Sequence, residues 1–378
     1  MLEILDFGDT GVFRHAMNYP CILILRRNAR TKSVFFPYKK ADGYPDRVIE
    51  EISVEQEGLS EDVWVFAPTE EMELYERLVA QNPPLQEWVE RIFTGVQSGA
   101  DKLLVLNAQE CKRRKYEKEM LHPILRGRDI RRYSVQWGGR YIFYPYMRKE
   151  GEYQIVDERE LKENPALYSH LSSHRSRLSE RVWFDQTAEE LSGAWYGLMY
   201  IGDPEWFASR KLITPALSSI PNFTLDERGY LFFTGTAGGY GLILSKEFDS
   251  KEWYLYLLGV LNSKVTEFCI KKVSPMFSGG FYKFNTQYLK RLPIRHIDFD
   301  NPEDAKMHDD VVALVERMLR LHKCLKEAKG QEKKTLERQI ARTDRQIDDL
   351  VYHLYGVTQK ERQIVEGKAE RSQNDQAT

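Results

Sequence analysis

The sequence predicts an α+β fold, and two observations carry this prediction. In residues 93–291, short apolar runs typical of strands alternate with glycine and proline turns and with helical stretches, as in proteins that mix sheets and helices. In residues 311–354, apolar side chains instead recur at alternating spacings of three and four, with a break at Gly330. Two such seams around a glycine indicate an antiparallel helical hairpin at the C-terminal end.

The N-terminal part of the chain, residues 1–35, is expected to be β structure. Residues 21–25 (CILIL) form a continuous apolar run, which is typical of a fully buried strand in the middle of a sheet. Few strand-like segments precede this run, so we expect the chain to begin partway through a domain.

Local patterns predict the elements that follow. Residues 36–84 are expected to connect two domains and to contain a helix over residues 70–80. A second helix is expected after Pro83 and Pro84, carrying Trp88, Val89 and Ile92. The patterns predict strands at residues 103–106, 141–144, 211–214 and 231–233, and helices around residues 166–181 and 253–272.

The C-terminal hairpin is expected within residues 298–367. Gly356 suits the end of its second helix, and Thr358 with Glu361 predicts a capping box for a last short helix. Residues 368–378 are polar and are expected to be a disordered tail. The two seams comprise Val311, Leu314, Met318, Leu321, Leu325 and Ala328, and then Leu336, Ile340, Thr343, Ile347, Leu350 and Leu354.

The composition narrows the class of protein. A chain of 378 residues with 42% hydrophobic and 30% charged residues is an ordinary globular protein of two or three domains. Its apolar runs are too short to cross a membrane, and Asp6 and Asp9 interrupt the start as no signal peptide would, so we expect a cytoplasmic protein. No metal site or disulfide is expected from the widely spaced cysteines, which are Cys21, Cys111, Cys269 and Cys324.

The charge is distributed unevenly. The formal net charge is only −2. Residues 110–149 nevertheless contain 12 Lys or Arg against 4 Asp or Glu, and residues 264–295 contain 7 against 1. These two segments are also rich in aromatic residues, so they favour an anionic ligand on one face. Two ordinary solvated faces are the alternative explanation.

A series of short motifs then resembles a known family. In order along the chain, the motifs are residues 92–102 (IFTGVQSGADK), 125–133 (LRGRDIRRY), 144–146 (YPY), 164–168 (NPALY), 213–215 (ITP), 233–237 (FTGTA), 257–263 (LLGVLNS) and 281–285 (FYKFN). Together they resemble the TaqI-like C-terminal specificity domain of adenine-N6 DNA methyltransferases and Type IIG restriction–modification enzymes. The resemblance covers residues 85–297. Residues 1–30 further resemble the last hairpin of the methyltransferase sheet that precedes this domain in such enzymes.

The resemblance implies that residues 85–297 recognise a short double-stranded DNA sequence. Arginines can grip phosphates or read guanine edges, and aromatic rings can pack on sugars or displaced bases. For each aromatic residue alone, packing in the core is the alternative. The implied DNA-binding residues are Lys102, Arg126, Arg128, Arg131, Arg132, Arg140, Tyr144, Tyr146, Tyr240, Lys271, Lys272, Phe277, Tyr282 and Lys283. Family members often have a basic residue before the glycine pair that precedes Phe281, where this chain has Ser278.

Catalytic residues are not expected in this chain. Asn82-Pro83-Pro84-Leu85 nearly matches the motif with which amino-methyltransferases hold a flipped base, but Leu85 has no ring to stack on it. Too few residues precede Asn82 to form a site for S-adenosylmethionine, so this cofactor is expected only in a methyltransferase core absent from the chain. A helix boundary is the alternative for this motif.

Other motifs favour structural roles. The glycine-dense residues 235–241 lack the Lys-Ser/Thr ending of a phosphate loop, so a tight turn is expected there. His170 and His174 lack the glutamate of a zinc protease motif. Residues 304–306 resemble the end of a nuclease motif without its partner carboxylate, and an acidic linker is the alternative. Two other functions remain open: an enzyme with an unrecognised site, and a non-catalytic assembly subunit that uses its helical hairpin.

Overall fold

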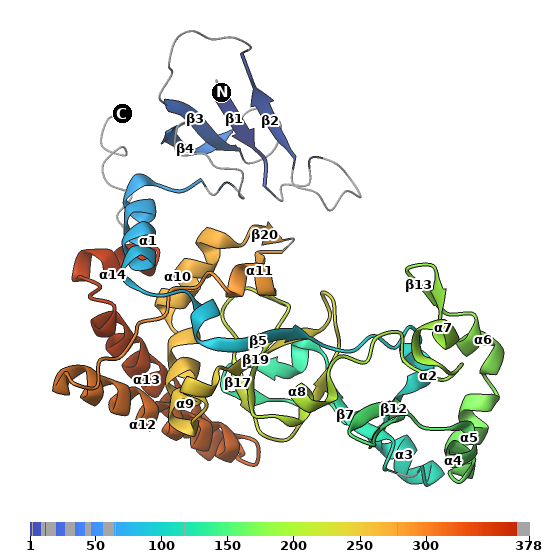
Figure 1. Ribbon diagram of the computed structural model, residues 1–378. Coiled ribbons are helices and arrows are strands. Elements are labelled where there is room, and N and C mark those ends of the chain that lie inside the picture. Colours follow the sequence, from blue (N-terminus) through green and yellow to red (C-terminus); the bar gives the residue numbers. More distant parts are fainter. Residues whose placement is uncertain are drawn as a thin grey trace.

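The computed structural model confirms the α+β class (Figure 1). It describes residues 1, 3–8, 12, 20–26, 35–41, 47–55, 64, 66–116, 118–277 and 279–368. The chain forms an N-terminal sheet, a central sheet covered by helices, a smaller lobe of short helices and strands, and a C-terminal helical hairpin (Figure 1). The expected tail lies outside the described residues from residue 369 onward.

The N-terminal sheet has the strand order β2-β1-β3-β4. Its strands are β1 (Glu3–Asp6), β2 (Cys21–Ile24), β3 (Phe35–Ala41) and β4 (Val48–Glu55), so the sheet continues into the region expected to connect two domains. β1 pairs antiparallel with β2, as a hairpin requires, and parallel with β3.

The prediction of a buried strand at residues 21–25 was wrong. β2 forms, but it is an edge strand whose side chains are all exposed, with Leu23 at 48%, and Leu25 just after the strand is 66% exposed. The apolar run correctly predicted a strand at this position. It could not show that one edge of β2 has no neighbouring strand among the described residues.

The connection to the central sheet contains one helix, not two. Helix α1 (Thr69–Gln81) matches the expectation, but a short 3-10 turn (η1, Leu85–Glu87) and strand β5 (Val89–Thr94) replace the second helix. The reason is tertiary: β5 pairs with β19 (Gly239–Leu244), and Trp88 stacks on Phe248 in the core, with ring centroids 4.3 Å apart. Long-range pairing therefore overrides the helical spacing of the apolar residues.

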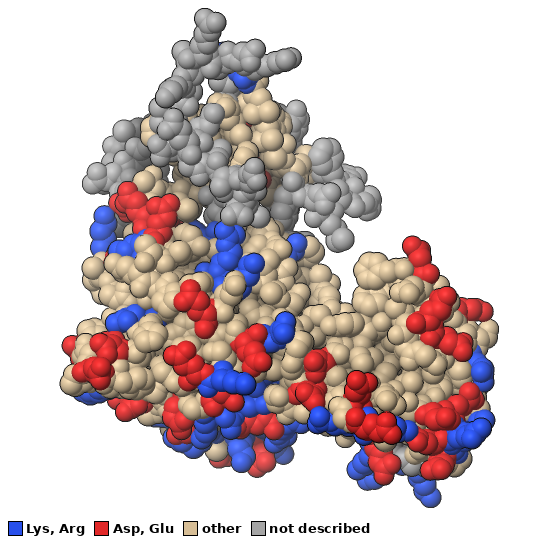
Figure 2. All heavy atoms as spheres, viewed as in Figure 1, with Lys and Arg blue, Asp and Glu red and all other residues tan. Residues whose placement is uncertain are grey.

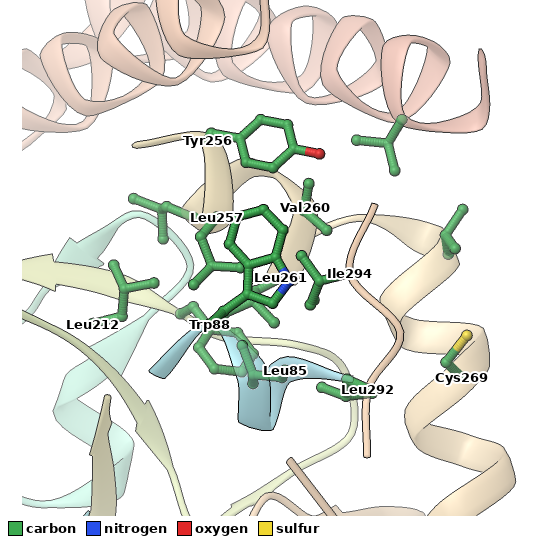
Figure 3. Close-up of a cluster of buried hydrophobic side chains, with 14 of the residues drawn as sticks. Leu85, Trp88, Leu212, Tyr256, Leu257, Val260, Leu261, Cys269, Leu292 and Ile294 are labelled. Atoms are coloured by element: carbon green, nitrogen blue, oxygen red, sulfur yellow. The ribbon is translucent and has the colours of Figure 1, made fainter. Parts of the chain in front are cut away.

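The central sheet has the antiparallel order β17-β15-β19-β5. β15 (Lys211–Pro215) and β17 (Thr224–Asp226) complete it, and α9 (Lys251–Leu261) and α10 (Lys264–Val273) replace the single helix expected at residues 253–272. The chain breaks there because the Ser263 side chain caps α10 by accepting from the N–H of Thr266. Figure 3 shows Trp88 and Leu85 enclosed by Leu212, Leu257 and neighbouring apolar side chains.

The helical hairpin covers α9. Helices α12 (Pro302–Leu325) and α13 (Gly330–Leu354) pack against each other, as the two seams predicted, and α12 also packs on α9. α9 carries Gly259 at this contact because a Cβ there would lie 2.8 Å from Val311 Cγ1. Gly356 has φ +57 after the end of α13, and Thr358 with Glu361 forms the predicted capping box of α14 (Gln359–Val365).

The smaller lobe has a separate core and a four-stranded sheet with the order β18-β7-β10-β6. Two predictions here were partly wrong. Residues 103–106 divide between helix α2 and strand β6, and the helix expected at residues 166–181 is interrupted at Ser173 and His174. The strands are β6 (Val105–Asn107), β7 (Leu121–Leu125), β10 (Arg140–Phe143) and β18 (Leu231–Phe232), and the helices are α2 (Asp101–Leu104), α3 (Ala108–Arg114), α4 (Glu158–Lys162), α5 (Pro165–Ser172), α6 (Arg175–Ser179) and α7 (Ala188–Ser192).

Short elements connect these parts. They are η2 (Gly127–Asp129), β8 (Ile130–Arg131), β9 (Ser134–Val135), β11 (Tyr146–Lys149), β12 (Glu152–Ile155), β13 (Val182–Trp183), β14 (Gln186–Thr187), α8 (Pro204–Ala208), β16 (Leu217–Ser218), η3 (Lys246–Phe248), β20 (Met276–Phe277), β21 (Phe281–Lys283) and α11 (Thr286–Leu289). Of the described helices, none combines the length and the apolar character needed to cross a bilayer.

Candidate nucleic-acid interface

Two arginines of the first basic segment line an open hollow of about 390 Å³. Arg126 and Arg128 flank Gly127 in the η2 turn, and across the hollow lie Phe277 and Phe281 of strands β20 and β21. The remaining lining residues are Leu217, Thr236 and Ala237. Among the described residues, none that lines this hollow is acidic, so its lining is positively charged, with walls formed by half-buried Phe277 and exposed Phe281.

The arginine-bearing turn is fixed by its neighbours. Buried Asp129 accepts the main-chain N–H of Arg126 at 2.8 Å and forms an ion pair with Arg140. The guanidinium of Arg126 lies 5.9 Å from the ring centroid of Phe233. Within the described part of the chain, neither Arg126 nor Arg128 has an acidic partner within ion-pair distance. Both charges are therefore available to an anionic ligand.

The glycine-dense loop supports this turn. The N–H of Gly127 donates to the carbonyl of Ala237 at 2.8 Å, and a Cβ at Gly127 would lie 2.6 Å from the carbonyl oxygen of Gly238. Gly238 itself approaches the Phe233 carbonyl so closely that a Cβ would lie 1.7 Å from it. The glycines thus allow two backbones to touch, which agrees with the tight turn expected there and not with a phosphate loop.

The second basic segment forms the opposite wall. Strands β20 and β21 pair antiparallel, and β21 pairs with β16. Lys283 Nζ lies 5.7 Å from the ring centroid of Phe277, and Lys271 Nζ lies 6.0 Å from that of Tyr282. Figure 2 shows Lys and Arg side chains gathered below the N-terminal sheet, where these elements lie. Ser278, the departure from the family pattern, lies outside the described residues.

Other residues expected to bind DNA are engaged within the fold. Arg132 donates to Asp344 of α13 and to the main-chain carbonyl of Asn262, and Arg140 is paired with Asp129. Arg131, next to Arg132, is exposed and has no acidic partner among the described residues. The basic run therefore divides into exposed cations and cations that hold the structure together.

The two tyrosines expected behind this run are buried. Tyr144 is 3% exposed and donates to the carbonyl of Ile201, and the hydroxyl of Tyr146, which is 7% exposed, accepts the N–H of Leu198. Burial raises the pKa of Tyr146 to about 12. Core packing, the alternative given for each aromatic residue, describes both rings.

The remaining expected residues lie in three places. Lys102 is exposed beside a separate hollow formed with Arg177 and Arg181. Lys271 pairs with Glu267 at 2.6 Å, and Lys272 pairs with Glu71 of α1. Tyr240 is half-buried in β19 opposite Thr94.

The near-catalytic motif is part of the core. Leu85 is fully buried, and the Asn82 amide donates to the carbonyl of Leu78 at 2.8 Å, ending helix α1. This arrangement does not fit a pocket for a flipped base, because the residue at the stacking position faces the core.

The other motifs also have structural contacts. A ring nitrogen of His170 lies 3.0 Å from the carbonyl of Leu103, and Asp304 accepts from Arg295 at 2.9 Å. Among the described residues, no group of three potential ligands could hold a metal ion. Phe281, Arg177 and Arg181 were not predicted as site residues from the sequence. Phe281 belongs to the family motif at residues 281–285, but nothing in the sequence indicated that the side chains of Arg177 and Arg181 meet.

Comparison with known proteins places this geometry in context. Residues 122–294 match the model of the TaqI-like C-terminal specificity domain family. The chain is 22% identical to the Type II restriction enzyme and methyltransferase RM.Eco57I of Escherichia coli, over 93% of this chain and 38% of that protein.

Two further relatives are Type II methyltransferases. Identity is 26% to M.PaeR7I of Pseudomonas aeruginosa, over 68% of this chain and 42% of the relative. It is 25% to M.XhoI of Xanthomonas vasicola, over 78% and 54%. The chain thus spans between 38% and 54% of the lengths of the three relatives.

Proposed function

Because residues 122–294 form a TaqI-like C-terminal specificity domain, we propose that this chain recognises a specific double-stranded DNA sequence for a restriction–modification methyltransferase. The observation that carries the proposal is the hollow between Arg126, Arg128 and the aromatic pair Phe277 and Phe281, whose described lining residues include no acidic one. Unpaired arginines suit phosphates and guanine edges, and exposed rings suit sugars and bases.

The chemistry proposed for the assembly is methyl transfer to adenine N6, as in the Type IIG class. A methyltransferase core outside residues 1–378 would supply S-adenosylmethionine and the catalytic residues. The motif at residues 82–85, which nearly matches that of amino-methyltransferases, has Leu85 buried at its stacking position. The contribution proposed for this chain is therefore binding and orientation of the duplex.

DNA binding by single variants tests the proposal. The chain is titrated with randomised duplexes at several salt concentrations. Replacing Arg128 with alanine should weaken binding and either reduce the salt dependence by about one unit of slope, as loss of a phosphate contact does, or relax preference at one base pair. Arg114, which is already paired with Glu110, gives a matched control variant. If R126A, R128A and R131A all bind like the unmodified chain, this hollow is not the DNA-binding surface.

Cofactor binding is tested separately. The isolated chain is expected neither to bind S-adenosylmethionine nor to methylate DNA. Saturable micromolar binding of the cofactor in a calorimetric titration would contradict this division of labour.

A non-catalytic assembly role is the second candidate, and the exposed strand β2 favours it. Ile22, Leu23 and Ile24 are each more than 40% exposed on an edge strand, and such edges pair readily with other strands. In this case, lysine substitutions at Leu23 and Ile24 should abolish association with the methyltransferase while duplex binding by the chain stays intact.

A further inference from the structure

The hairpin β13–β14 ends in an exposed phenylalanine with an unusual backbone conformation. Val182 pairs with Thr187 and Trp183 with Gln186, so Phe184 and Asp185 alone form the loop. Their φ angles are +49° and +62°, the pattern of a type I′ turn, which normally takes Asn and Gly. A bulky side chain in this region of backbone conformation destabilises the fold.

This phenylalanine contributes little to any core. Phe184 is 81% exposed and Val182 is 59% exposed. The Phe184 ring lies 4.8 Å from that of Trp183, which lies 6.1 Å from that of Tyr200, itself 38% exposed. Phe184 therefore destabilises the turn through its backbone conformation, and burial of its ring restores little of that stability. This combination points to a binding role for Phe184.

The base of the hairpin is held firmly. Arg181 is 7% exposed and donates to the carbonyls of Leu178, Ser98 and Trp195 at 2.7, 2.6 and 2.9 Å. On the other strand, Thr187 caps helix α7 with Glu190. The tip is therefore carried on an ordered support.

Arg181 also places an uncompensated positive charge beside the hairpin. Its three bonds go to neutral carbonyls, and no carboxylate pairs with it in the described part of the chain. Burial lowers the pKa of Arg181 to about 10, so it stays charged at neutral pH. It lines a hollow of about 310 Å³ with Lys102 and Arg177; of the described residues around this hollow, only Asp101 is acidic, and it accepts a hydrogen bond from Ser98.

The tip itself is acidic, unlike this hollow. Asp185 is exposed, and Glu189 on α7 is exposed nearby. A carboxylate is repelled by DNA phosphates, but in the major groove it can accept a hydrogen bond from the amino group of cytosine, while Phe can contact the methyl group of thymine. Phe184 and Asp185 are thus suited to base edges, and the hollow to a phosphate.

We propose that hairpin β13–β14 enters the major groove of the target duplex, where Phe184 packs on a thymine methyl group and Asp185 accepts from a cytosine amino group, while Lys102, Arg177 and Arg181 hold a neighbouring phosphate. The major groove admits a two-stranded ribbon of this kind. The inference rests on the proposed function and adds a second reading element to it.

Hairpin β13–β14 and the hollow beside Arg126 and Arg128 can contact the same duplex. Hairpin β13–β14 and strand β20 project to the same side of the molecule (Figure 1). Val96 forms a parallel β-bridge with Phe233, whose ring centroid lies 5.9 Å from the guanidinium of Arg126. Gly99, three residues after Val96, lines the hollow that contains Arg177 and Arg181. Three residues of extended chain span at most about 11 Å, which bounds the distance between Val96 and Gly99.

The test selects randomised duplexes on the full chain and compares the variants F184N and D185N. Because asparagine suits the left-handed turn, F184N should melt at the same or a higher temperature yet bind the selected duplex about five- to a hundredfold more weakly. D185N should lose preference at one base pair and bind duplexes of unselected sequence more tightly, because a repulsive charge is removed. F299A, at a phenylalanine that is 54% exposed and far from the hairpin in sequence, is the control for DNA binding and should leave affinity and sequence preference unchanged.

The results for these variants and for R128A distinguish failure of the hairpin inference from failure of the proposed function. If F184N and D185N select the same sequence with unchanged affinity while R128A is weakened, the hairpin inference is wrong and the proposed function stands. If the unmodified chain enriches no sequence and R128A changes nothing, the proposed function fails and the hairpin inference fails with it. A loss of binding by F184N that accompanies a lower melting temperature indicates a structural role and also overturns the inference.

Discussion

Arg132 joins the basic segment at residues 126–132 to the helical hairpin through Asp344. Its Nε and Nη2 atoms donate to Asp344 Oδ1 at 3.1 and 2.6 Å, and Nη1 donates to the carbonyl of Asn262 at the end of α9. Lys326 of the loop between the hairpin helices adds a bond to the carbonyl of Val135 at 2.9 Å. The hairpin therefore supports the segment whose exposed members are Arg128 and Arg131.

Replacing Arg132 is expected to act on stability more than on direct contact with DNA. R132A leaves Asp344 and the Asn262 carbonyl without their donor, so it should lower the free energy of unfolding by about 1–3 kcal/mol. R132K should recover only part of the lost free energy of unfolding, because a single ammonium group cannot make the two-pronged contact of the guanidinium. Urea unfolding measures the stability of both variants. If R132A is as stable as the unmodified chain but the salt dependence of its DNA binding falls by about one unit of slope, Arg132 instead contacts a phosphate.

The interface beside this pair should make stability depend on pH. Burial raises the pKa of Asp348 to about 6 from an ordinary value of 3.8, even though its Oδ1 accepts the N–H of Lys264 at 2.9 Å. A carboxyl with a raised pKa stabilises the fold below its unfolded pKa, and this contribution is lost as the pH rises through the folded pKa. The loss therefore occurs between about pH 4 and pH 6.

The variant D348N should remove this dependence. It keeps an acceptor for Lys264 and carries no charge, so it should be more stable than the unmodified chain at pH 7.5 by on the order of 1–3 kcal/mol. The difference should fall toward zero below pH 4. Thermal unfolding across this range provides the measurement, and a difference that does not vary with pH would show that Asp348 is not the titrating group.

A fully buried ion pair holds the central sheet at β15 and β17. Lys211 Nζ lies 2.7 Å from Asp226 Oδ2, and neither side chain is exposed. Asp226 also accepts the N–H groups of Arg228 and Tyr230. Removing one partner leaves the other charge unpaired in the core, so K211M and D226N should each cost about 3–5 kcal/mol. The double variant should cost less than the sum of the two, and additive losses in denaturant unfolding would contradict a coupled pair.

The turn between Arg126 and Arg128 should not tolerate a side chain. G127A places a Cβ about 2.6 Å from the Gly238 carbonyl oxygen, so the turn must move away from the glycine loop. Overpacking of this kind costs about 1–3 kcal/mol, and the shifted arginines should weaken DNA binding. G127A with unchanged affinity would show that the position of this turn does not matter for binding.

The sequence alone determined the elements whose patterns are long and local. The two seams around Gly330 predicted α12 and α13, and Thr358 with Glu361 predicted the capping box, because each depends on spacing along one helix. The ordered series of motifs also predicted the similarity of residues 122–294 to the TaqI-like C-terminal specificity domain family. The strand at residues 21–24 was predicted for the same reason, since its apolar run is a local signal.

Only the tertiary structure decided what those elements face. It placed β2 at an exposed edge, turned residues 89–94 into a strand paired with β19, and divided the basic run into free and structural arginines. It also brought Arg181 of one segment to Lys102 of another, and it set Phe184 at a turn that its residue type disfavours. Burial, pairing and charge compensation depend on neighbours far apart in sequence, so a local pattern carries no information about them.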